Sequence, residues 1–279
     1  MATKIDWYPS PAKLNLFLHI NGRYENGYHQ LQSLFQMLDY GDELGFQVNS
    51  SNMVTLHKQI DGVPEQENLI YKAAMLLKPY AAESAGCIVH LKKRLAMGGG
   101  IGGGSSNAAT VLLVLNKLWK CELSNADLAK LGLTLGADVP VFVQGKTAFA
   151  QGVGEILVPV KLPTKWYLVA TPQVHVSTQA IFTHPDLPRS TPKIEFSDYS
   201  FEGTHNDCET LVSKLHKEVA SLLQWLLHYA PSRMTGTGAS VFAVFNAKED
   251  AQNVLDKLPS HYTGFVAKGV NHSGIHKAL

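Results

Sequence analysis

The chain has 279 residues, of which 45% are apolar and 17% are charged, and its 24 Lys and Arg against 23 Asp and Glu leave a net charge of +1. This near-neutral balance argues against a nucleic-acid partner and against attraction to an anionic membrane. The sequence contains no run of the ~18 apolar residues that a membrane-spanning helix needs. The apolar run at 14–20 is interrupted by Asn15 and His19, so it is a poor secretory signal.

Three cysteines, Cys87, Cys121 and Cys208, lie far apart and show no zinc-like spacing. Their odd number predicts reduced thiols that serve in packing, and therefore a cytoplasmic protein. The length predicts two domains, which can bury their apolar cores without disulfides or a structural metal.

The first predicted element is a strand at 13–20, where the segment KLNLFLHI alternates. Leu14 and its alternate neighbours share one face of this strand, and Lys13, Asn15, Phe17 and His19 share the other. Lys13 and Asn15 are therefore expected to project side by side.

The remaining elements follow from hydrophobic spacing and turn signals. The first half is predicted as strands at 42–49 and 52–58, a helix at 67–84, a strand at 87–95, a glycine-rich turn, a helix at 105–119, a helix opened by a Ser124/Asp127 capping box and ended by Gly136, and a strand pair at 146–160. The second half is predicted as a strand at 166–171, a helix from 177, a loop at 184–206, a helix at 207–229, strands at 233–235 and 239–245, a helix at 247–258 and a strand at 262–270. With its first two helices counted as one crossover, the second half has the split β-α-β-β-α-β arrangement. Pro159 and Pro163 bracket a boundary near 160, which divides the chain into domains 1–160 and 161–279.

Six of the seven residues from 98 to 104 are glycine, between a predicted strand and a predicted helix. Glycine loses more conformational freedom on folding than other residues, so the run indicates that something approaches the main chain closely. Free backbone N–H groups at the start of a helix suit a phosphate group. The sequence therefore predicts a phosphate-binding loop, with a flexible turn as the alternative.

Two other phosphate-binding patterns fit this loop less well. Gly104 is followed by Ser105 and not by the lysine of a P-loop. Gly98, Gly100 and Gly103 satisfy G-x-G-x-x-G, but a tract this rich in glycine matches almost automatically, and the acidic residue expected after the next strand is absent. A dinucleotide-dependent oxidoreductase is thus a weak alternative.

Three segments together resemble the GHMP kinases. GGGIGGGSSNAA at 98–109 is similar to the ATP-phosphate loop of that family, PAKLNLFLHI at 11–20 to its N-terminal motif, and MTGTGASVFAVF at 234–245 to its C-terminal glycine motif. NGYHQLQSLFQMLDYGD at 26–42 and LGADVPVFVQG at 135–145 resemble a member that acts on a cytidine-diphosphate sugar alcohol. The chain departs from the family pattern at Ala96 and Gln179, where the resemblance would place prolines.

The resemblance implies an α+β, two-domain GHMP kinase fold, in which a ribosomal-protein-S5-like ATP-binding domain is followed by a ferredoxin-like β-α-β-β-α-β substrate domain. It implies an enzyme that uses ATP and Mg²⁺ to phosphorylate the 2-hydroxyl of 4-diphosphocytidyl-2-C-methyl-D-erythritol, a step of the non-mevalonate isoprenoid route. The expected partners are small molecules, without nucleic acid or membrane. The expected state is a cytoplasmic monomer or weak homodimer.

The resemblance also implies roles for individual residues. Lys13 and Asp138 would form the catalytic pair, with Asp138 in a turn shaped by Pro140 and acting either as a general base or as a carboxylate that orients the hydroxyl. Ser106 would serve Mg²⁺. The residues expected at ATP are Asn68, Leu69, Met97, Gly98, Gly99, Gly100, Ile101, Gly102, Gly103, Gly104, Ser105, Ser106 and Asn107. The residues expected at the substrate are Asn15, Tyr28, His29, Thr178, Phe182, Gly236 and Gly238, with Tyr28 and Phe182 sandwiching the pyrimidine and His29 bonding its edge.

The sequence leaves alternatives open. Another GHMP kinase, for homoserine or mevalonate, would have no pyrimidine to stack on Tyr28 and Phe182. A catalytically inactive nucleotide-binding member would have lost Lys13 and Asp138, both of which are present. Without the resemblance, Lys13 would be a solvated strand lysine, Asp138 a turn-capping residue and Phe182 a core residue.

Overall fold

The computed structural model describes residues 5–60 and 62–279 of the chain. Its first half contains β1 (Asp6–Arg23), β2 (His29–Asn49), β3 (Val54–Leu56), α1 (Leu69–Leu77), β4 (Gly86–Lys92), α2 (Gly103–Leu118), α3 (Asn125–Leu133), α4 (Val139–Gln144), β5 (Ala148–Gln151) and β6 (Ile156–Pro159). Its second half contains β7 (Trp166–Pro172), α5 (Thr178–Thr183), α6 (Glu209–Leu215), α7 (Lys217–Leu227), β8 (Ser232–Met234), β9 (Val241–Phe245), α8 (Lys248–Leu255), β10 (Tyr262–Val270) and α9 (Ile275–Ala278).

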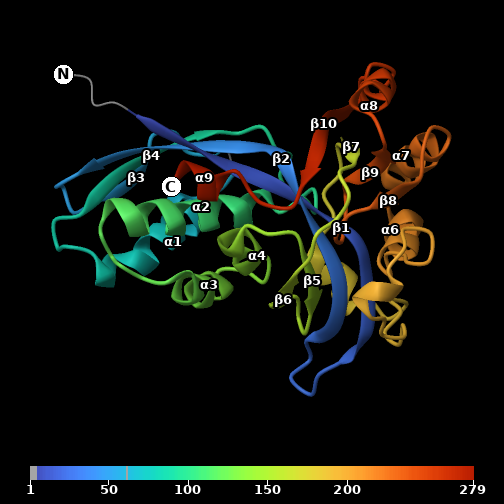
Figure 1. The fold of residues 1–279 in the computed structure, drawn as a ribbon, viewed down its shortest axis with the longest axis horizontal. Helices are drawn as coiled ribbons and strands as arrows, with labels where there is room; N and C mark the ends of the chain where they lie inside the picture. Colours follow the sequence, from blue (N-terminus) through green and yellow to red (C-terminus); the bar gives the residue numbers. More distant parts are fainter. Residues whose placement is uncertain (1–4, 61) are drawn as a thin grey trace.

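The strands form one connected sheet in the order β3-β4-β2-β10-β7-β9-β8, with β1 and β5 also paired to β2 and β6 paired to β5. Figure 1 shows two lobes, with α1 and α2 beneath the strands of the first lobe and α6, α7 and α8 on the outer side of the second. The last strand joins the lobes, because Gly269 and Val270 at the end of β10 pair with Leu38 and Met37 of β2.

The second lobe has the predicted β-α-β-β-α-β order, with antiparallel pairs throughout β10-β7-β9-β8. Alternate residues of β7 separate onto two faces: Leu168 and Ala170 pack against the helices, and Tyr167 and Val169 pack into a core shared with the first lobe. That shared core also contains Ile101 of the glycine loop. The predicted α+β architecture is confirmed, and the division at residue 160, which falls between β6 and β7, stays a prediction.

The middle of strand β1 is buried on both faces, so Lys13 is not the solvated strand lysine that it would be without the resemblance. Lys13, Asn15 and His19 are each only 3% exposed, and Phe17 is fully buried. The register of β1 against β2 is irregular between Pro11 and Lys13 and again beyond Asn15. These irregularities leave backbone groups of β1 free to bond elsewhere: Lys13 N–H donates to Ile101 O at 3.1 Å.

The helices differ from those predicted at several places, of which three change the order or continuity of the elements. Helix α3 is opened by Ser124 as expected, since its hydroxyl accepts from Asp127 N–H at 3.2 Å, but it ends at Leu133 and not at Gly136. The short helix α4 was not predicted, because its six residues carry no full period of the helical pattern. The predicted helix 207–229 is broken at His216, whose extended backbone separates α6 from α7.

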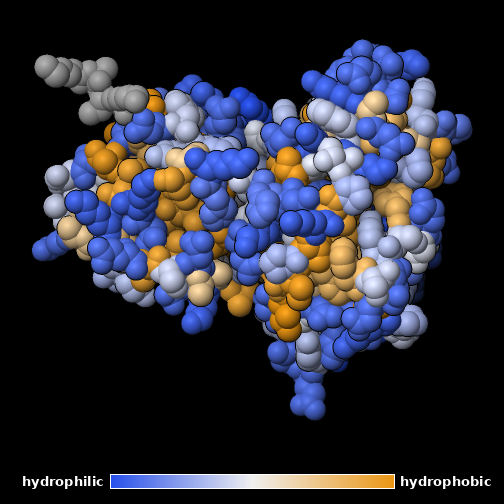
Figure 2. All heavy atoms as spheres, viewed as in Figure 1, coloured by the Kyte–Doolittle hydropathy of each residue, from blue (hydrophilic) through white to orange (hydrophobic). Residues whose placement is uncertain are grey.

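On the face drawn in Figure 2, hydrophilic residues lie over both lobes, and apolar residues show on the first lobe and near β5 and β6. Ile156 and Val158 of β6 are each 52% exposed there. Within the described part of the chain, none of the helices has the length and apolar character needed to cross a membrane.

Candidate active site

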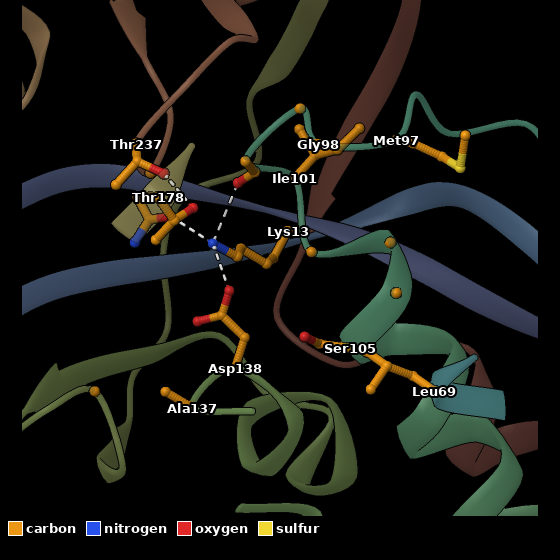
Figure 3. A pocket seen from close by; sticks show the side chains of 18 of the residues that line it. Lys13, Leu69, Met97, Gly98, Ile101, Ser105, Ala137, Asp138, Thr178 and Thr237 are labelled. Atoms are coloured by element: carbon orange, nitrogen blue, oxygen red, sulfur yellow. Dashed lines mark hydrogen bonds and ion pairs between the residues drawn. The ribbon is translucent and has the colours of Figure 1, made fainter. Parts of the chain in front are cut away.

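A cavity of about 590 Å³ opens where β1, the glycine loop, the start of α2, the turn before α4, α5 and the 235–238 loop converge. Figure 3 shows Lys13 at its centre, between Asp138 on one side and the glycine loop on the other. Elements from both lobes therefore build one site, as a kinase requires if it is to bring a donor and an acceptor together.

Lys13 is fixed in place by polar contacts although it is almost fully buried. Its Nζ lies 3.1 Å from Asp138 Oδ2 and donates hydrogen bonds to Asn15 Oδ1 at 2.5 Å and to Gly100 O at 3.3 Å. The ammonium also lies 5.2 Å from the centre of the Phe35 ring. A buried cation needs such partners, and here they aim its charge into the cavity.

Asp138 occupies the N-cap position of α4, but its side chain makes no capping hydrogen bond. Pro140 lies in the first turn of this helix, where the missing proline N–H costs nothing. The carboxylate is therefore free to meet Lys13, and it is 35% exposed toward the cavity. The structure thus brings the predicted pair together within ion-pair distance.

The glycines of the loop serve protein packing as well as access for a ligand. Gly100 has φ +72°, and a Cβ there would lie 2.5 Å from Thr235 O. Gly102 has φ +76°, and a Cβ there would lie 2.6 Å from the Phe142 ring. At these two positions the close approach comes from the protein itself. The sequence predicted these glycines from the close approach of a ligand alone. Packing against the protein explains Gly100 and Gly102 as well.

Helix α2 begins at Gly103, two residues before the predicted start, and its first turn lines the cavity. The N–H groups of this first turn have no intrahelical acceptor, so they are available to a phosphate group. Ser105 lines the cavity and Figure 3 shows its hydroxyl directed toward Asp138.

Ser106, the residue expected at Mg²⁺, lies outside the lining of the cavity. It is fully buried, and its hydroxyl accepts a hydrogen bond from Ser10 Oγ at 2.9 Å. Ser10 Oγ also lies 2.7 Å from Asn107 Oδ1, and its single hydrogen is shared between these two acceptors. Ser106 therefore anchors α2 to β1, and Ser105 presents the hydroxyl that faces the cavity.

A buried carboxylate that the sequence analysis missed holds the entrance of the glycine loop. Asp42, 1% exposed, accepts from the backbone N–H of Arg94 at 2.7 Å and of Leu95 at 2.9 Å through Oδ1. Its Oδ2 accepts from Lys93 Nζ at 2.7 Å and from Asn107 Nδ2 at 3.2 Å. These bonds tie β2, the loop and α2 together, and Lys93 also lines the cavity. No local motif marks such a contact between distant segments.

One end of the cavity is apolar and is lined by Ile60, Val63 and Leu69 together with Asn68. Asn68 is the N-cap of α1, and its Oδ1 accepts from Ile70 N–H at 2.9 Å. Asn68 and Leu69 therefore lie where an adenine ring could pack, while Asn68 also caps a helix.

The other end of the cavity is formed by α5 and the 235–238 loop. Thr178 Oγ1 lies 2.9 Å from Thr237 Oγ1, and Phe182 and Gly236 line the wall. Gly238 is outside the lining; its N–H donates to Thr235 O at 3.0 Å, which shapes the loop. Gly238 thus shapes the loop from outside the lining.

Of the three residues expected at the cytidine, Phe182 alone lines the cavity. His29 is not among the lining residues but lies beside Phe182, with ring centroids 5.3 Å apart. Tyr28 is 65% exposed on the turn between β1 and β2, outside the lining. Burial lowers the pKa of His29, and Arg189 and Arg23 lower it further. The described arrangement places His29 against Phe182 and leaves the Tyr28 half of the expected sandwich open.

Most of the expected site residues lie along this one cavity. The predicted residues in its lining are Lys13, Asn15, Asn68, Leu69, Met97, Gly98, Gly99, Gly100, Ile101, Gly102, Gly103, Gly104, Ser105, Asn107, Asp138, Thr178, Phe182 and Gly236. The predicted residues outside it are Tyr28, His29, Ser106 and Gly238. The lining also contains Ser33, Glu67, Lys93 and Thr237, which the sequence analysis did not single out.

The residues of this cavity fit a magnesium ion that arrives with a nucleotide. Among the residues described, no group of three or more His, Cys, Asp or Glu side chains converges to hold a metal. Mg²⁺ takes one or two carboxylates and keeps substrate phosphates and waters as its other ligands. The Asp138 carboxylate and the Ser105 hydroxyl meet that need beside the glycine loop.

Comparison with known proteins gives consistent matches across the chain. A model described as the GHMP kinases N terminal domain matches residues 68–146, and one described as GHMP kinases C terminal matches residues 192–264. The 4-diphosphocytidyl-2-C-methyl-D-erythritol kinase of Pseudoalteromonas atlantica is 62% identical over 279 residues, which is 100% of this chain and 98% of the relative. That of Shewanella loihica is 54% identical over 267 residues, with 95% of this chain and 94% of the relative covered.

A solved structure agrees with these matches. The crystal structure of a 4-(cytidine 5'-diphospho)-2C-methyl-D-erythritol kinase superposes with a TM-score of 0.82 at 31% identity, and covers 95% of this chain and 100% of its own. The similarity therefore extends over both lobes and the cavity between them.

Proposed function

This chain belongs to the GHMP kinases and, among them, to the family of 4-diphosphocytidyl-2-C-methyl-D-erythritol kinases, and from that premise we propose how it works. It transfers the γ-phosphoryl group of ATP to the 2-hydroxyl of 4-diphosphocytidyl-2-C-methyl-D-erythritol, a step toward isoprenoid precursors. The observation that carries this proposal is the 3.1 Å pair of Lys13 and Asp138 in a cavity that also holds the glycine loop and the start of α2.

The glycine loop and the first turn of α2 bind the ATP phosphates through backbone N–H groups. The adenine ring packs at the apolar end, against Leu69 and beside Asn68. Lys93, whose Nζ is held by Asp42, adds positive charge next to the start of α2. This binding leaves the γ-phosphoryl group near Lys13, since Lys13 Nζ donates to Gly100 O in the loop itself.

Asp138 accepts a hydrogen bond from the acceptor hydroxyl and aligns its oxygen with the γ-phosphorus. As the new O–P bond forms and the bond from the γ-phosphorus to the bridging oxygen breaks, ADP leaves and the hydroxyl proton passes to Asp138. The transition state is loose, so the proton moves late and positioning supplies much of the rate. Lys13 offsets the charge on the phosphoryl oxygens throughout the transfer.

Ser105 and Asp138 would hold Mg²⁺ together with the ATP phosphates, and the ion would neutralise negative charge at the transferring group. Ser105 takes this role in place of Ser106, because the Ser105 hydroxyl faces the cavity and the Ser106 hydroxyl is buried against Ser10.

Phe182 and His29 support the cytidine compound as the acceptor. An aromatic face beside a ring that offers a hydrogen bond suits a pyrimidine base, and base stacking contributes about 1–3 kcal/mol. Mevalonate and homoserine carry no such ring. Tyr28 completes the stack if the exposed β1–β2 turn closes over a bound base.

The enzyme works on small molecules in the cytoplasm as a monomer or weak homodimer, without nucleic acid. The odd number and wide spacing of its cysteines support a reducing compartment, and Cys87 and Cys208 are buried as packing residues.

The test is a parallel assay of the purified protein with ATP and Mg²⁺ and three acceptors: the cytidine compound, mevalonate and homoserine. ADP release with the cytidine compound alone is the expected result. Equal turnover of mevalonate or homoserine would instead support one of the other GHMP kinase activities.

A further inference from the structure

Arg189 donates five hydrogen bonds near the cytidine end of the cavity, and neither a motif nor the family resemblance predicted a role for it. Its Nη1 donates to Leu187 O at 2.9 Å and to Pro185 O at 3.4 Å. Its Nη2 donates to His184 O at 2.7 Å and to Phe182 O at 3.2 Å. One guanidinium thus gathers four carbonyls from the end of α5 and the loop that follows it.

The fifth bond joins this loop to another element. Arg189 Nε lies 3.0 Å from His29 Nε2, at the first residue of β2. A guanidinium can only donate, so His29 Nε2 must be the acceptor and carry no proton. The neutral imidazole therefore holds its single proton on Nδ1.

The charges around His29 favour that neutral form. Arg189 approaches from the loop after α5 and Arg23 from the end of β1, while Phe182 covers the ring from α5 with an apolar surface. Both cations and burial lower the pKa of His29. At neutral pH the ring is thus an uncharged donor at one defined nitrogen.

We propose that Arg189 is a positioning and specificity residue, which selects the Nδ1–H form of His29 and holds Phe182 beside it. This inference rests on the proposed function only for its ligand, a pyrimidine base with an acceptor atom on its edge. Arg189 does not itself touch the base. It acts through His29 and Phe182.

The kinetic test is Arg189→Met, which removes the donor and keeps an apolar side chain. At pH 8 we expect KM for the cytidine substrate to rise about 10-fold, with KM for ATP unchanged, since a ligand hydrogen bond and part of the wall are lost. As the pH falls and His29 becomes protonated, KM of the variant should recover several-fold, because a protonated imidazole carries hydrogen on both nitrogens. Wild-type KM should stay flat over this range.

Arg23→Met is the matched control. It removes the other cation near His29 and leaves the partner of Nε2 in place. Its KM should stay within about twofold of wild type at pH 8. If Arg23→Met reproduces the profile of Arg189→Met, charge alone explains the effect and the proposal is overturned.

The tautomer is measured without substrate by ¹⁵N NMR of labelled histidines, with His29→Gln to assign the signal. Wild type should show a protonated Nδ1 and a bare Nε2 at pH 7.5, and Arg189→Met should shift the proton toward Nε2 and raise the midpoint of titration. A bare Nδ1 in wild type, or a variant with the wild-type ring signals, would overturn the proposal. Failure of wild type to use the cytidine compound would overturn the proposed function. The NMR measurement would still test whether Arg189 selects the Nδ1–H form of His29.

Discussion

Lys13 Nζ and Asp138 Oδ2 lie 3.1 Å apart, one from the buried strand β1 and the other from the cap of the short helix α4. The lysine is 3% exposed and the aspartate 35% exposed, so the pair presents its carboxylate to the cavity and keeps its ammonium anchored. The chemistry we propose depends on this asymmetry, because a fixed cation and an accessible base face the same reacting group.

Asp138→Asn should lower kcat about 10²- to 10⁴-fold, since the amide cannot accept the hydroxyl proton. Binding of the nucleotide in the absence of Mg²⁺ should persist, because the glycine loop is untouched. Steady-state kinetics and titration with an ATP analogue check both points. A variant with wild-type kcat would remove Asp138 from the mechanism.

Lys13→Met should lower kcat about 10²- to 10³-fold, because the positive charge that offsets the negative charge of the transferring phosphoryl group is lost. The methionine fills most of the buried space that the lysine stem occupies, so the fold should survive. Circular dichroism serves as the control. A folded variant with undiminished kcat would show that Lys13 has only a structural role.

Gly100→Ala should lower the free energy of unfolding by about 2 to 4 kcal/mol, because alanine is strained at φ +72° and its Cβ would meet Thr235 O. Gly104→Ala is the control: its Cβ would lie 3.4 Å from Leu69 Cδ1, an ordinary contact, and stability should change by less than about 0.5 kcal/mol. Urea unfolding measures both. Equal stability of the two variants would contradict the packing role of Gly100.

Asp42→Asn should lower the free energy of unfolding by about 3 kcal/mol, since a buried carboxylate that accepts from four donors is replaced by a group that accepts less well. KM for ATP should rise as the start of the loop loosens. The neighbouring surface residue offers the comparison, because Glu43→Gln removes exposed ion pairs worth about 0–1 kcal/mol. If both changes cost the same, Asp42 does not organise the loop.

His19 should make stability fall with acid. Burial, His205 and Arg233 lower the pKa of His19 to about 4, against an opposing effect of Asp207. The unfolded chain binds this proton near pH 6.5, so the stabilisation is full above that pH and is lost as the pH falls toward 4, by up to about 3 kcal/mol. His19 Nδ1 has no hydrogen-bond partner within the described part of the chain.

Chemical denaturation of wild type and His19→Phe at pH 7.5 and pH 5 tests this effect. The carboxylates titrate in both proteins, so the difference between the two pH slopes isolates His19. The phenylalanine variant should lose less stability in acid than wild type. An equal loss of unfolding free energy between pH 7.5 and pH 5 in the two proteins would mean that folding does not lower the pKa of His19.

The order of the elements could be predicted because hydrophobic spacing is local: the β-α-β-β-α-β order of the second lobe needed no more than that. The burial of both faces of β1 could not be predicted from local spacing, because it results from the 235–238 loop and the glycine loop, which pack over Lys13 and Asn15. Helix α4 has six residues, which is too short for a helical hydrophobic period to be detected in the sequence.

Within the site, the resemblance supplied Lys13, Asp138 and the glycine loop, but it could not orient neighbouring side chains. Successive residues of a helix point about 100° apart, so the choice between Ser105 and Ser106 depends on how α2 is rotated against β1. Asp42 and Arg189 were missed for a different reason. Their partners lie in segments distant along the chain or are backbone atoms. A local sequence motif does not indicate contacts of either kind.

The most direct test of the account is a crystal structure of the protein with a non-hydrolysable ATP analogue, Mg²⁺ and 4-diphosphocytidyl-2-C-methyl-D-erythritol. We predict that the 2-hydroxyl oxygen lies within hydrogen-bond distance of the Asp138 carboxylate, with Lys13 Nζ beside the γ-phosphoryl group. A complex in which the cytidine or another part of the substrate meets Asp138, and the 2-hydroxyl points away from the nucleotide, would contradict it.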